Sequence, residues 1–337
     1  MDNTFTSYKM EDRSYVSYIK REIHNRVTRA RFGAHKIGQI DIIVSEMTSN
    51  IIKHAGGGEL LVRVRTDDDS PVVEVISIDN GPGMTDTTRM LRDGVSTTRT
   101  LGQGLGAVSR LSDVSQLYSI PKWGTIHYAM VKGTPDSSFI PEKKPIEIRA
   151  LCVNKPREEV CGDGFSIKRN LPEMTIFFAD GLGHGIHARA AVEAASEIFL
   201  ETSEKDPVGV IRALHQNIRK TRGLVGVVAV ADHRQREWRI CGVGNIITRI
   251  YSGVGHRNYM SYNGTIGLTI PNAMNISTYP METNQHLVMC SDGIQTRWDM
   301  SRYPAILKYD NIMLAAAIYK DYARGTDDAS VIIAKVA

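Results

Sequence analysis

The stretch FFADGLGHGIHA, from Phe177 to Ala188, decides how the second half of this chain is interpreted. An apolar run ends at Asp180, and three glycines and two histidines follow that aspartate. Three interpretations fit these residue types: a loop that cradles phosphate, a histidine metal site, or a tight turn between a strand and a helix. For a single Asp-Gly pair the turn is the best interpretation. Choosing one of the other two therefore needs support from the rest of the chain.

Length and composition indicate a globular protein with two domains. A chain of 337 residues suits two domains of average size, and 42% hydrophobic with 23% charged residues is ordinary for a chain that builds apolar cores. The 41 basic and 37 acidic residues leave a formal net charge of +4, which is small and not concentrated in one segment. Nucleic acid is therefore not an expected partner.

Cysteine usage and hydropathy predict a cytoplasmic protein without a membrane role. The four cysteines form no CxxC pair, so neither a zinc framework nor disulfides are expected, and reduced thiols fit the cytoplasm. The N-terminal residues lack the apolar core of a signal peptide. The longest apolar runs, such as LVGVVAVA from Leu224, are too short to span a bilayer.

Hydrophobic periodicity predicts an α+β chain with two differently built domains. Helices are expected over about 14–31 and 35–54, followed by the strands ELLVRVR and PVVEVISID and by a hairpin of VSQLYSI with GTIHYAMV. Residues 133–145 are rich in proline, serine and charge, as in a linker. We therefore predict an α/β sandwich over residues 1–132 and a β-rich sandwich with outer helices over residues 146–337. The helices of the second domain are expected near 186–200, 208–219 and 311–322.

Four features of the first domain predict a nucleotide site without a P-loop. Glu46 and Asn50 lie one helical turn apart, so both side chains project from the same face, where their oxygens suit Mg²⁺. Asp79 follows a strand and can accept a hydrogen bond from an exocyclic amine. Gly81 and Gly83 let a flat base approach the backbone.

The remaining two features are a glycine loop and a strand start. GQGLG precedes a helix whose N–H groups and dipole favour phosphate, and its members are Gly102, Gly104, Leu105 and Gly106. Thr125 follows Gly124 at the start of a strand. Each feature alone is weak, but their order and spacing resemble the GHKL ATP-binding fold over about 15–132. DGVSTTRTLGQGLGAVSRLSD is especially similar to the serine switch kinases of bacterial partner-switching and stressosome pathways.

The resemblance to these kinases implies ATP and Mg²⁺ as cofactors and gives each residue a role. Asn50 would hold Mg²⁺, Glu46 would be the general base for the substrate hydroxyl, and Asp79 would bind adenine. The glycines would line the base pocket (Gly83) and wrap the phosphates (Gly102, Gly104 and Gly106), and Thr125 would support Asp79. An active kinase and a domain that binds ATP without transferring phosphate both fit these residues.

A second group of residues predicts a metal site in the β-rich half. Asp163, Asp180, Asp292 and Asp327 each lie where an apolar strand begins or ends, beside glycine or another small residue. Carboxylates supply the oxygen ligands that hard cations take, and glycine leaves room for bound water and an exposed carbonyl. Two close metal ions can activate water and bind a phosphoryl group.

The motifs GDGF, DGLGHG, CSDGI and DDASVII resemble the PPM-type metal-dependent serine/threonine phosphatases, in their SpoIIE-like branch. This resemblance implies an α-β-β-α sandwich with two Mn²⁺ or Mg²⁺ ions. It implies that Asp163, Asp180, Asp292 and Asp327 are ligands, directly or through water. The Gly181 carbonyl would be a further ligand, with catalysis centred on Asp163 and Asp180, and the adjacent Asp328 would support the ligands.

The histidines of the opening stretch depart from the family pattern. The eukaryotic branch has a histidine, a proposed general acid, directly after its Asp-Gly, whereas this chain has Leu182 there and a histidine only at His184. The acid is therefore His184, a metal-bound water, or absent. His184 and His187 also have the spacing of a zinc pair, although no third ligand is evident and a histidine that caps or packs at the helix start is the better interpretation.

Together the two resemblances imply a bifunctional switch protein. It would phosphorylate a serine or threonine of a STAS-domain partner protein and remove the phosphate again, and the resemblance allows a homodimer and a downstream switch protein. One alternative is a phosphatase regulated by a nucleotide-sensing domain without kinase activity. Another is a non-catalytic antagonist that sequesters a sigma factor or activator.

Overall fold

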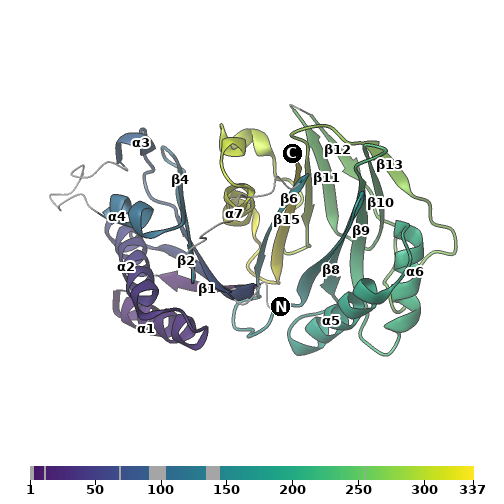
Figure 1. Ribbon diagram of the computed structural model, residues 1–337, viewed down its shortest axis with the longest axis horizontal. Coiled ribbons are helices and arrows are strands. Elements are labelled where there is room, and N and C mark those ends of the chain that lie inside the picture. The colour runs from purple at the N-terminus through teal and green to yellow at the C-terminus, as the bar shows by residue number, and fades with distance from the viewer. Residues whose placement is uncertain (1–3, 11–12, 68–69, 91–103, 134–144, 254) are drawn as a thin grey trace. The chain divides into compact units, whose positions relative to one another are not determined.

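The computed structural model describes residues 4–10, 13–67, 70–90, 104–133, 145–253 and 255–337 (Figure 1). The chain divides into two compact units. One comprises Met1–Pro141 with Tyr303–Ala317, and the other comprises Glu142–Arg302 with Ile318–Ala337. Each unit mixes helices and strands, as the α+β prediction requires.

The first unit is a five-stranded antiparallel sheet with helices on one face (Figure 1). The strands are, in sheet order, β1 (Thr4–Met10), β2 (Gly58–Asp67), β3 (Ser70–Asp79), β5 (Gly124–Lys132) and β4 (Val114–Ile120). The covering helices are α1 (Arg13–Arg29), α2 (Ala34–Asn50) and α4 (Gly104–Leu111), and the short α3 spans Thr87–Met90. Apolar residues at helical spacing on α1, namely Ile19, Ile23 and Val27, are buried against this sheet.

The predicted helices and hairpin of this unit are present, with two differences. Strand β1 was not predicted, because its run TFTSYKM is short and half polar, yet its apolar residues are buried beside β2. The second helix ends its α-form at Asn50 and continues as the π-helix η1, Ile51–Ala55. Gly56 then ends it with a left-handed φ of 72°.

A segment from late in the chain completes the first unit. Tyr303–Ala317 belongs to the same compact unit as β4, whereas the residues before and after it belong to the second unit. This segment includes the 3₁₀ turn η3 (Ile306–Lys308). The Tyr118 hydroxyl donates to the Pro304 carbonyl at 3.1 Å, and the Tyr118 and Tyr309 rings meet edge to face at 5.5 Å. This packing could not be predicted from sequence, because aromatic contacts across such a separation leave no periodic pattern.

The second unit is a sandwich of two five-stranded antiparallel sheets. One sheet has the order β13 (Ser277–Pro280), β10 (Glu237–Val243), β9 (Leu224–Asp232), β8 (Glu173–Gly181) and β7 (Asp163–Asn170). The other has the order β12 (Gly255–Tyr259), β11 (Ile247–Ser252), β14 (His286–Cys290), β15 (Ala329–Val336) and β6 (Ile146–Val153). The unpredicted strands β7, β12 and β13 are largely polar or exposed, and the last two are also short.

Helices α5 (Ile186–Glu201) and α6 (Pro207–Asn217) cover the outer face of the β8–β10 sheet (Figure 1). Strand β8 is therefore buried on both faces, because Ile176 and Phe178 enter the core between the sheets while Phe177 packs against Phe199 of α5. This explains why its sequence is continuously apolar. Helix α7 spans Asn311–Tyr322, the range in which a helix was predicted, but its residues up to Ala317 belong to the first unit. The 3₁₀ turn η2 spans Met300–Arg302.

The four cysteines, Cys152, Cys161, Cys241 and Cys290, are buried and form no disulfide. Among the described residues, no helix has the length and apolar character that crossing a bilayer requires.

Candidate functional site

Strand pairing brings the four predicted aspartates to one edge of the sandwich. Asp163 begins β7 and Asp180 lies near the end of β8, and the two residues face each other directly in that pair. In the other sheet, Asp292 follows the end of β14 and Asp327 precedes the start of β15. Because β14 and β15 are antiparallel, these two ends also meet.

A serine links the two sheets at this edge. The Ser291 hydroxyl donates to Asp163 Oδ2 at 2.7 Å and accepts from the Ser330 backbone N–H at 3.0 Å. Asp163 is only 1% exposed, and its Oδ1 has no hydrogen-bond partner in the described part of the chain. A buried carboxylate oxygen without a donor is costly unless a cation satisfies it, so this residue fits a metal ligand.

The aspartates interact electrostatically. Burial raises the pKa of Asp163 to about 7, against the hydrogen bond from Ser291 that lowers it. Burial also raises the pKa of Asp180 well above its usual range, and the negative charges of Asp163 and Asp292 add to this rise. The carboxylates therefore share one electrostatic environment that a bound cation would stabilise in the ionised form.

Asp328 has a different role from its neighbour Asp327. Its Oδ1 accepts the Lys155 backbone N–H at 2.7 Å and its Oδ2 accepts the Gly162 backbone N–H at 2.8 Å. These bonds occupy both carboxylate oxygens and hold the loop that leads into Asp163. The geometry agrees with the supporting role predicted for Asp328.

The donor set fits hard cations that keep water ligands. No three His, Cys, Asp or Glu side chains converge around one point within the described ranges, so side chains alone do not form a closed shell. Mg²⁺ and Mn²⁺ accept carboxylates, main-chain carbonyls and water together. The predicted Gly181 carbonyl ends β8 beside Asp180, where it can complement the carboxylates.

Two residues that the sequence did not reveal hold the Asp292 loop. Asn245 Nδ2 donates to Asp292 Oδ2 at 3.0 Å, and Arg324 Nε donates to the Asp292 carbonyl at 2.8 Å. The only sequence signal for Asn245 is the turn composition of GVGN at the end of β10. Its partner follows β14, the strand that pairs with β11, and a linear pattern does not reveal this pairing.

His184 has a carboxylate partner. Its Nδ1 lies 2.6 Å from Glu158 Oε1, and a Cβ on Gly185 would lie 2.8 Å from Glu158 Oε2. In the described ranges, no group of three candidate ligands includes His184 and His187, so the zinc alternative gains no support.

The first unit brings Glu46, Asn50 and Gly104 together. A Cβ on Gly104 would lie 2.4 Å from Glu46 Oε2 and 3.9 Å from Asn50 Oδ1, so α4 begins directly against this helix face. Asn50 Nδ2 is buried and has no hydrogen-bond partner among the residues described. Leu105 and Gly106 continue α4, whereas Gly102 lies outside the described residues.

Asp79, Gly81 and Thr125 form a second group in this unit. Asp79 Oδ1 accepts the Gly81 N–H at 2.8 Å and the Thr125 N–H at 3.2 Å. Thr125 thus supports Asp79 through its backbone. A Cβ on Gly81 would lie 2.9 Å from that of Ala55 in η1, so the π-helix brings the end of the α2 helix to the Asp79 turn.

Gly83 lies against the β4–β5 turn. Its φ is 71°, and a Cβ there would lie 2.0 Å from the Ile120 carbonyl oxygen. Only glycine fits both constraints.

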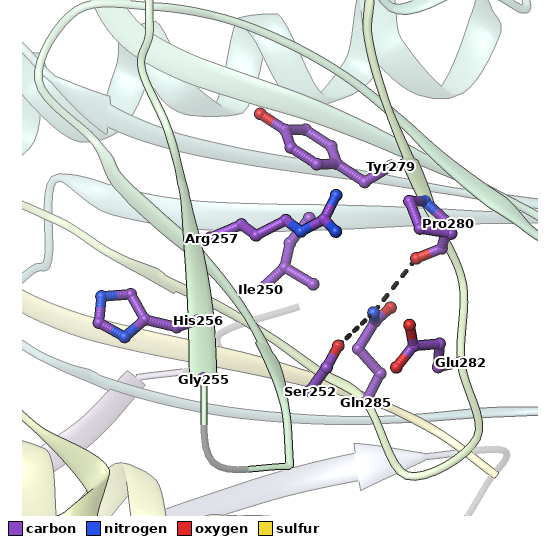
Figure 2. Close-up of a pocket in the computed structure, with 9 residues that line it drawn as sticks. All are labelled: Ile250, Ser252, Gly255, His256, Arg257, Tyr279, Pro280, Glu282 and Gln285. Carbon is purple, nitrogen blue, oxygen red and sulfur yellow. Dashed lines mark hydrogen bonds between the residues drawn. The ribbon is translucent and has the colours of Figure 1, made fainter.

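A separate pocket lies at the other end of the sandwich (Figure 2). Its volume is about 270 Å³, and Gln285 Nε2 donates within it to Ser252 Oγ at 2.8 Å and to the Pro280 carbonyl at 3.2 Å. Strand β11 leads from the aspartates to the pocket: it begins at Ile247, which lies near Asp292, and it ends at Ser252 in the pocket wall. None of the predicted site residues lines this pocket, whose walls are Ile250, Ser252, Gly255, His256, Arg257, Tyr279, Pro280, Glu282 and Gln285.

Comparison with known families matches both parts of the chain. Residues 11–124 match the family described as histidine kinase-like ATPase domain, and residues 172–337 match stage II sporulation protein E (SpoIIE). The serine/threonine-protein kinase RsbT of Bacillus subtilis is 35% identical over 94 residues, which is 28% of this chain and 71% of RsbT. The phosphoserine phosphatase RsbX of the same organism is 27% identical over 120 residues, 36% of this chain and 60% of RsbX.

Solved structures also resemble the chain, and two of them illustrate the similarity. One, from work on the bacterial stressosome as a modular system adapted to control secondary messenger signalling, has a TM-score of 0.53 at 28% identity, covering 57% of this chain and all of the other. RsbX in complex with magnesium has a TM-score of 0.52 at 21% identity, covering 58% of this chain and 98% of that structure. The chain belongs to the histidine kinase-like ATPase family that includes RsbT, and joins such a domain to a PPM-type SpoIIE domain homologous to RsbX.

Proposed function

We propose that this protein is a bifunctional signalling switch. Its C-terminal domain hydrolyses phosphoserine or phosphothreonine with two Mn²⁺ or Mg²⁺ ions, and its N-terminal domain transfers phosphate from ATP to serine or threonine. The shared substrate is a STAS-domain partner protein. The observation that carries the proposal is the meeting of Asp163, Asp180, Asp292 and Asp327 at one edge of the sandwich. Its four buried thiols suit the cytoplasm.

In the phosphatase domain, the aspartate cluster holds the metals. The ligands are Asp163, Asp180, Asp292 and Asp327 with the Gly181 carbonyl, and the bound ions supply an activated water and charge neutralisation for the phosphoryl group. The chain's other residues fix the ligands. Ser291 orients Asp163 and Asn245 orients Asp292 through the hydrogen bonds described above.

In the kinase domain, Glu46 orients the substrate hydroxyl and accepts its proton. Phosphoryl transfer passes through a loose transition state, so positioning and charge neutralisation are the main tasks of the protein. Asn50 holds Mg²⁺, Asp79 binds adenine, and the α4 N-terminus at Gly104 receives the phosphates. The contact of Gly104 with Glu46 brings the base to the phosphate end of the nucleotide.

The test uses the full chain and its cognate STAS protein. With ATP and Mg²⁺ we expect phosphorylation that Glu46→Gln abolishes, and with Mn²⁺ we expect removal of the phosphate that Asp180→Asn abolishes. Absence of both transfer and removal would refute the proposal. Removal without transfer, at a rate that nucleotide changes, would instead identify a phosphatase with a nucleotide sensor.

A further inference from the structure

Arg222 lies across from the loop that follows the Asp180–Gly181 ligands. In the β8–β9 pair Asp180 faces Val225 and Gly181 faces Leu224. The Leu182 N–H donates to the Gly223 carbonyl at 3.1 Å, which continues the ladder by one residue. The next residues along the two segments are Gly183 and Arg222, two positions beyond the Gly181 carbonyl.

The Arg222 guanidinium lies directly against Gly183. A Cβ on Gly183 would be 3.0 Å from Arg222 Nη1, and no other described residue, apart from the two chain neighbours of Gly183, comes within 4 Å of that Cβ. Gly183 also has a φ of 84°, a conformation that favours glycine. Glycine at this position therefore leaves space for a cationic side chain beside the loop.

The guanidinium is available for a ligand. Arg222 is exposed, and it forms no hydrogen bond or ion pair within the described part of the chain. The other basic side chain of this loop, His184, is paired with Glu158. At the same edge, Arg324 is already bonded to the Asp292 carbonyl.

Charge and geometry indicate what Arg222 would bind. Four aspartate carboxylates are balanced by two divalent cations, so a phosphate monoester dianion brings negative charge that the site does not yet match. A guanidinium forms paired, charge-assisted hydrogen bonds with phosphoryl oxygens. We propose that Arg222 binds the phosphoryl group of the incoming phosphoserine or phosphothreonine at the rim of the aspartate cluster. This inference rests on the proposed phosphatase function.

The chain supplies matched controls for the test. Arg219 and Lys220 are exposed cations in the same α6–β9 connection. Arg219→Ala and Lys220→Ala therefore remove the same charge from the same segment. Arg222→Lys keeps the charge but loses the planar guanidinium.

The experiment measures kinetics and binding on the full chain loaded with Mn²⁺. KM and kcat are measured with a phosphoserine peptide, and the affinity for inorganic phosphate is measured directly by calorimetry. We expect Arg222→Ala to raise KM and to weaken phosphate binding by on the order of 10- to 100-fold, because charge-assisted hydrogen bonds are lost. Arg222→Lys recovers part of this loss, and the two controls change either quantity by less than about threefold, as expected for screened surface charges.

Several results would overturn the proposal. Unchanged KM and phosphate affinity in Arg222→Ala would do so. Equal losses in Arg219→Ala and Lys220→Ala would also overturn it, because the effect would then come from the positive charge of the whole segment and not from Arg222. A loss of Mn²⁺ affinity or of thermal stability in both Arg222 variants would assign it a structural role.

Failure of the proposed function has a separate signature. Wild-type protein that hydrolyses no phosphoester with Mn²⁺ or Mg²⁺ would refute the phosphatase activity. The phosphate titration of the Mn²⁺-loaded protein would still decide whether Arg222 binds a phosphoryl group.

Discussion

Two atoms mark the candidate sites at the scale of single residues. Asp163 Oδ1 and Asn50 Nδ2 are both buried, and neither has a hydrogen-bond partner among the described residues. Native interiors rarely leave such atoms unsatisfied. One lies in the aspartate cluster and the other on the Glu46 face, so each of the two predicted sites contains a group that a ligand would satisfy.

The Asp163 carboxyl should make the metal-free protein less stable at high pH. Its pKa is raised to about 7 in the folded chain, above the value of 3.8 for an unperturbed aspartate. Between these values the folded state keeps a proton that the unfolded state has released, so stability falls as pH rises, by at most about 1.4 kcal/mol per pH unit. In chelator, Asp163→Asn should therefore melt above wild type at pH 8 and close to it at pH 4.

Metal provides the control for this prediction. Mn²⁺ at pH 8 should stabilise wild type more than Asp163→Asn, because the metal binds the ionised carboxylate. If Mn²⁺ raises the stability of Asp163→Asn as much as that of wild type, Asp163 is not a metal ligand.

Asn245→Ala should weaken metal binding without unfolding the domain. Asn245 holds the Asp292 carboxylate from an exposed position, so its loss frees the ligand but opens no core cavity. Groups that orient metal ligands typically contribute about 10- to 100-fold in affinity. A Mn²⁺ titration would measure this, with Asn258→Ala on the exposed strand β12 as control. Equal Mn²⁺ affinities in the two variants would refute the positioning role.

At the scale of elements, the junction of α2, η1 and α4 builds the nucleotide site. The π-helix shifts the helix end toward the Asp79 turn, and α4 starts against Glu46. Residue spacing predicted that Glu46 and Asn50 share a face. The π-turn, in contrast, has no propensity signal, because it arises from tertiary packing.

Gly104→Ala should abolish phosphoryl transfer while the fold is kept. Its Cβ would overlap Glu46 Oε2, the end of a flexible side chain, so the base moves and the backbone does not. Gly38→Ala is the matched control, because this exposed α2 glycine has nothing within 4 Å of an added Cβ. That control should stabilise the helix by about 0.5–1 kcal/mol. Phosphoryl-transfer assays measure the activity of both variants, and thermal melts check that each is folded. A Gly104→Ala variant that still transfers phosphate would contradict the assigned role of Glu46.

Most elements and the aspartates were predictable, but the residues that hold them were not. Asp180 and Asp292 could be identified because each follows a continuous apolar strand. Ser291, Asn245 and Glu158 act through partners on other strands or loops, so only the register reveals them. Strand β7 was missed because only Phe165 and Ile167 of its eight residues are apolar side chains that pack against the core, which is too few for a clear strand signal.

At the scale of the whole molecule, the chain divides into two compact units, and the proposed function gives each unit its own ligand. We therefore expect two unfolding transitions, because two-state behaviour is a property of single domains. ATP with Mg²⁺ should raise one transition and Mn²⁺ the other.

Glu74→Gln should lower the transition of the first unit. Glu74 is 1% exposed and lies 2.6 Å from Arg63 Nη2, with the Tyr128 hydroxyl at 2.8 Å. Burial alone would raise its pKa, but Arg63 and Arg65 lower it to about 2. Removing one partner of a buried ion pair costs about 3–5 kcal/mol.

The pH dependence of this loss gives the check. Glu74 stabilises the folded unit above the unfolded pKa of 4.5, and this stability is lost as pH falls toward 2. The free energy of unfolding, measured with denaturant, should therefore differ most between Glu74→Gln and wild type at neutral pH, and this difference should become smaller below pH 4.5. A constant difference across this range would contradict the charged pair.

The buried cysteines have a consequence for the proposed signalling function. Burial raises the pKa of Cys161 and Cys290, and that of Cys241 to about 11. Peroxide attacks the thiolate, and these thiols stay protonated and shielded. The chain would then report on phosphate transfer alone, with an output that is blind to the oxidants that accompany many stresses.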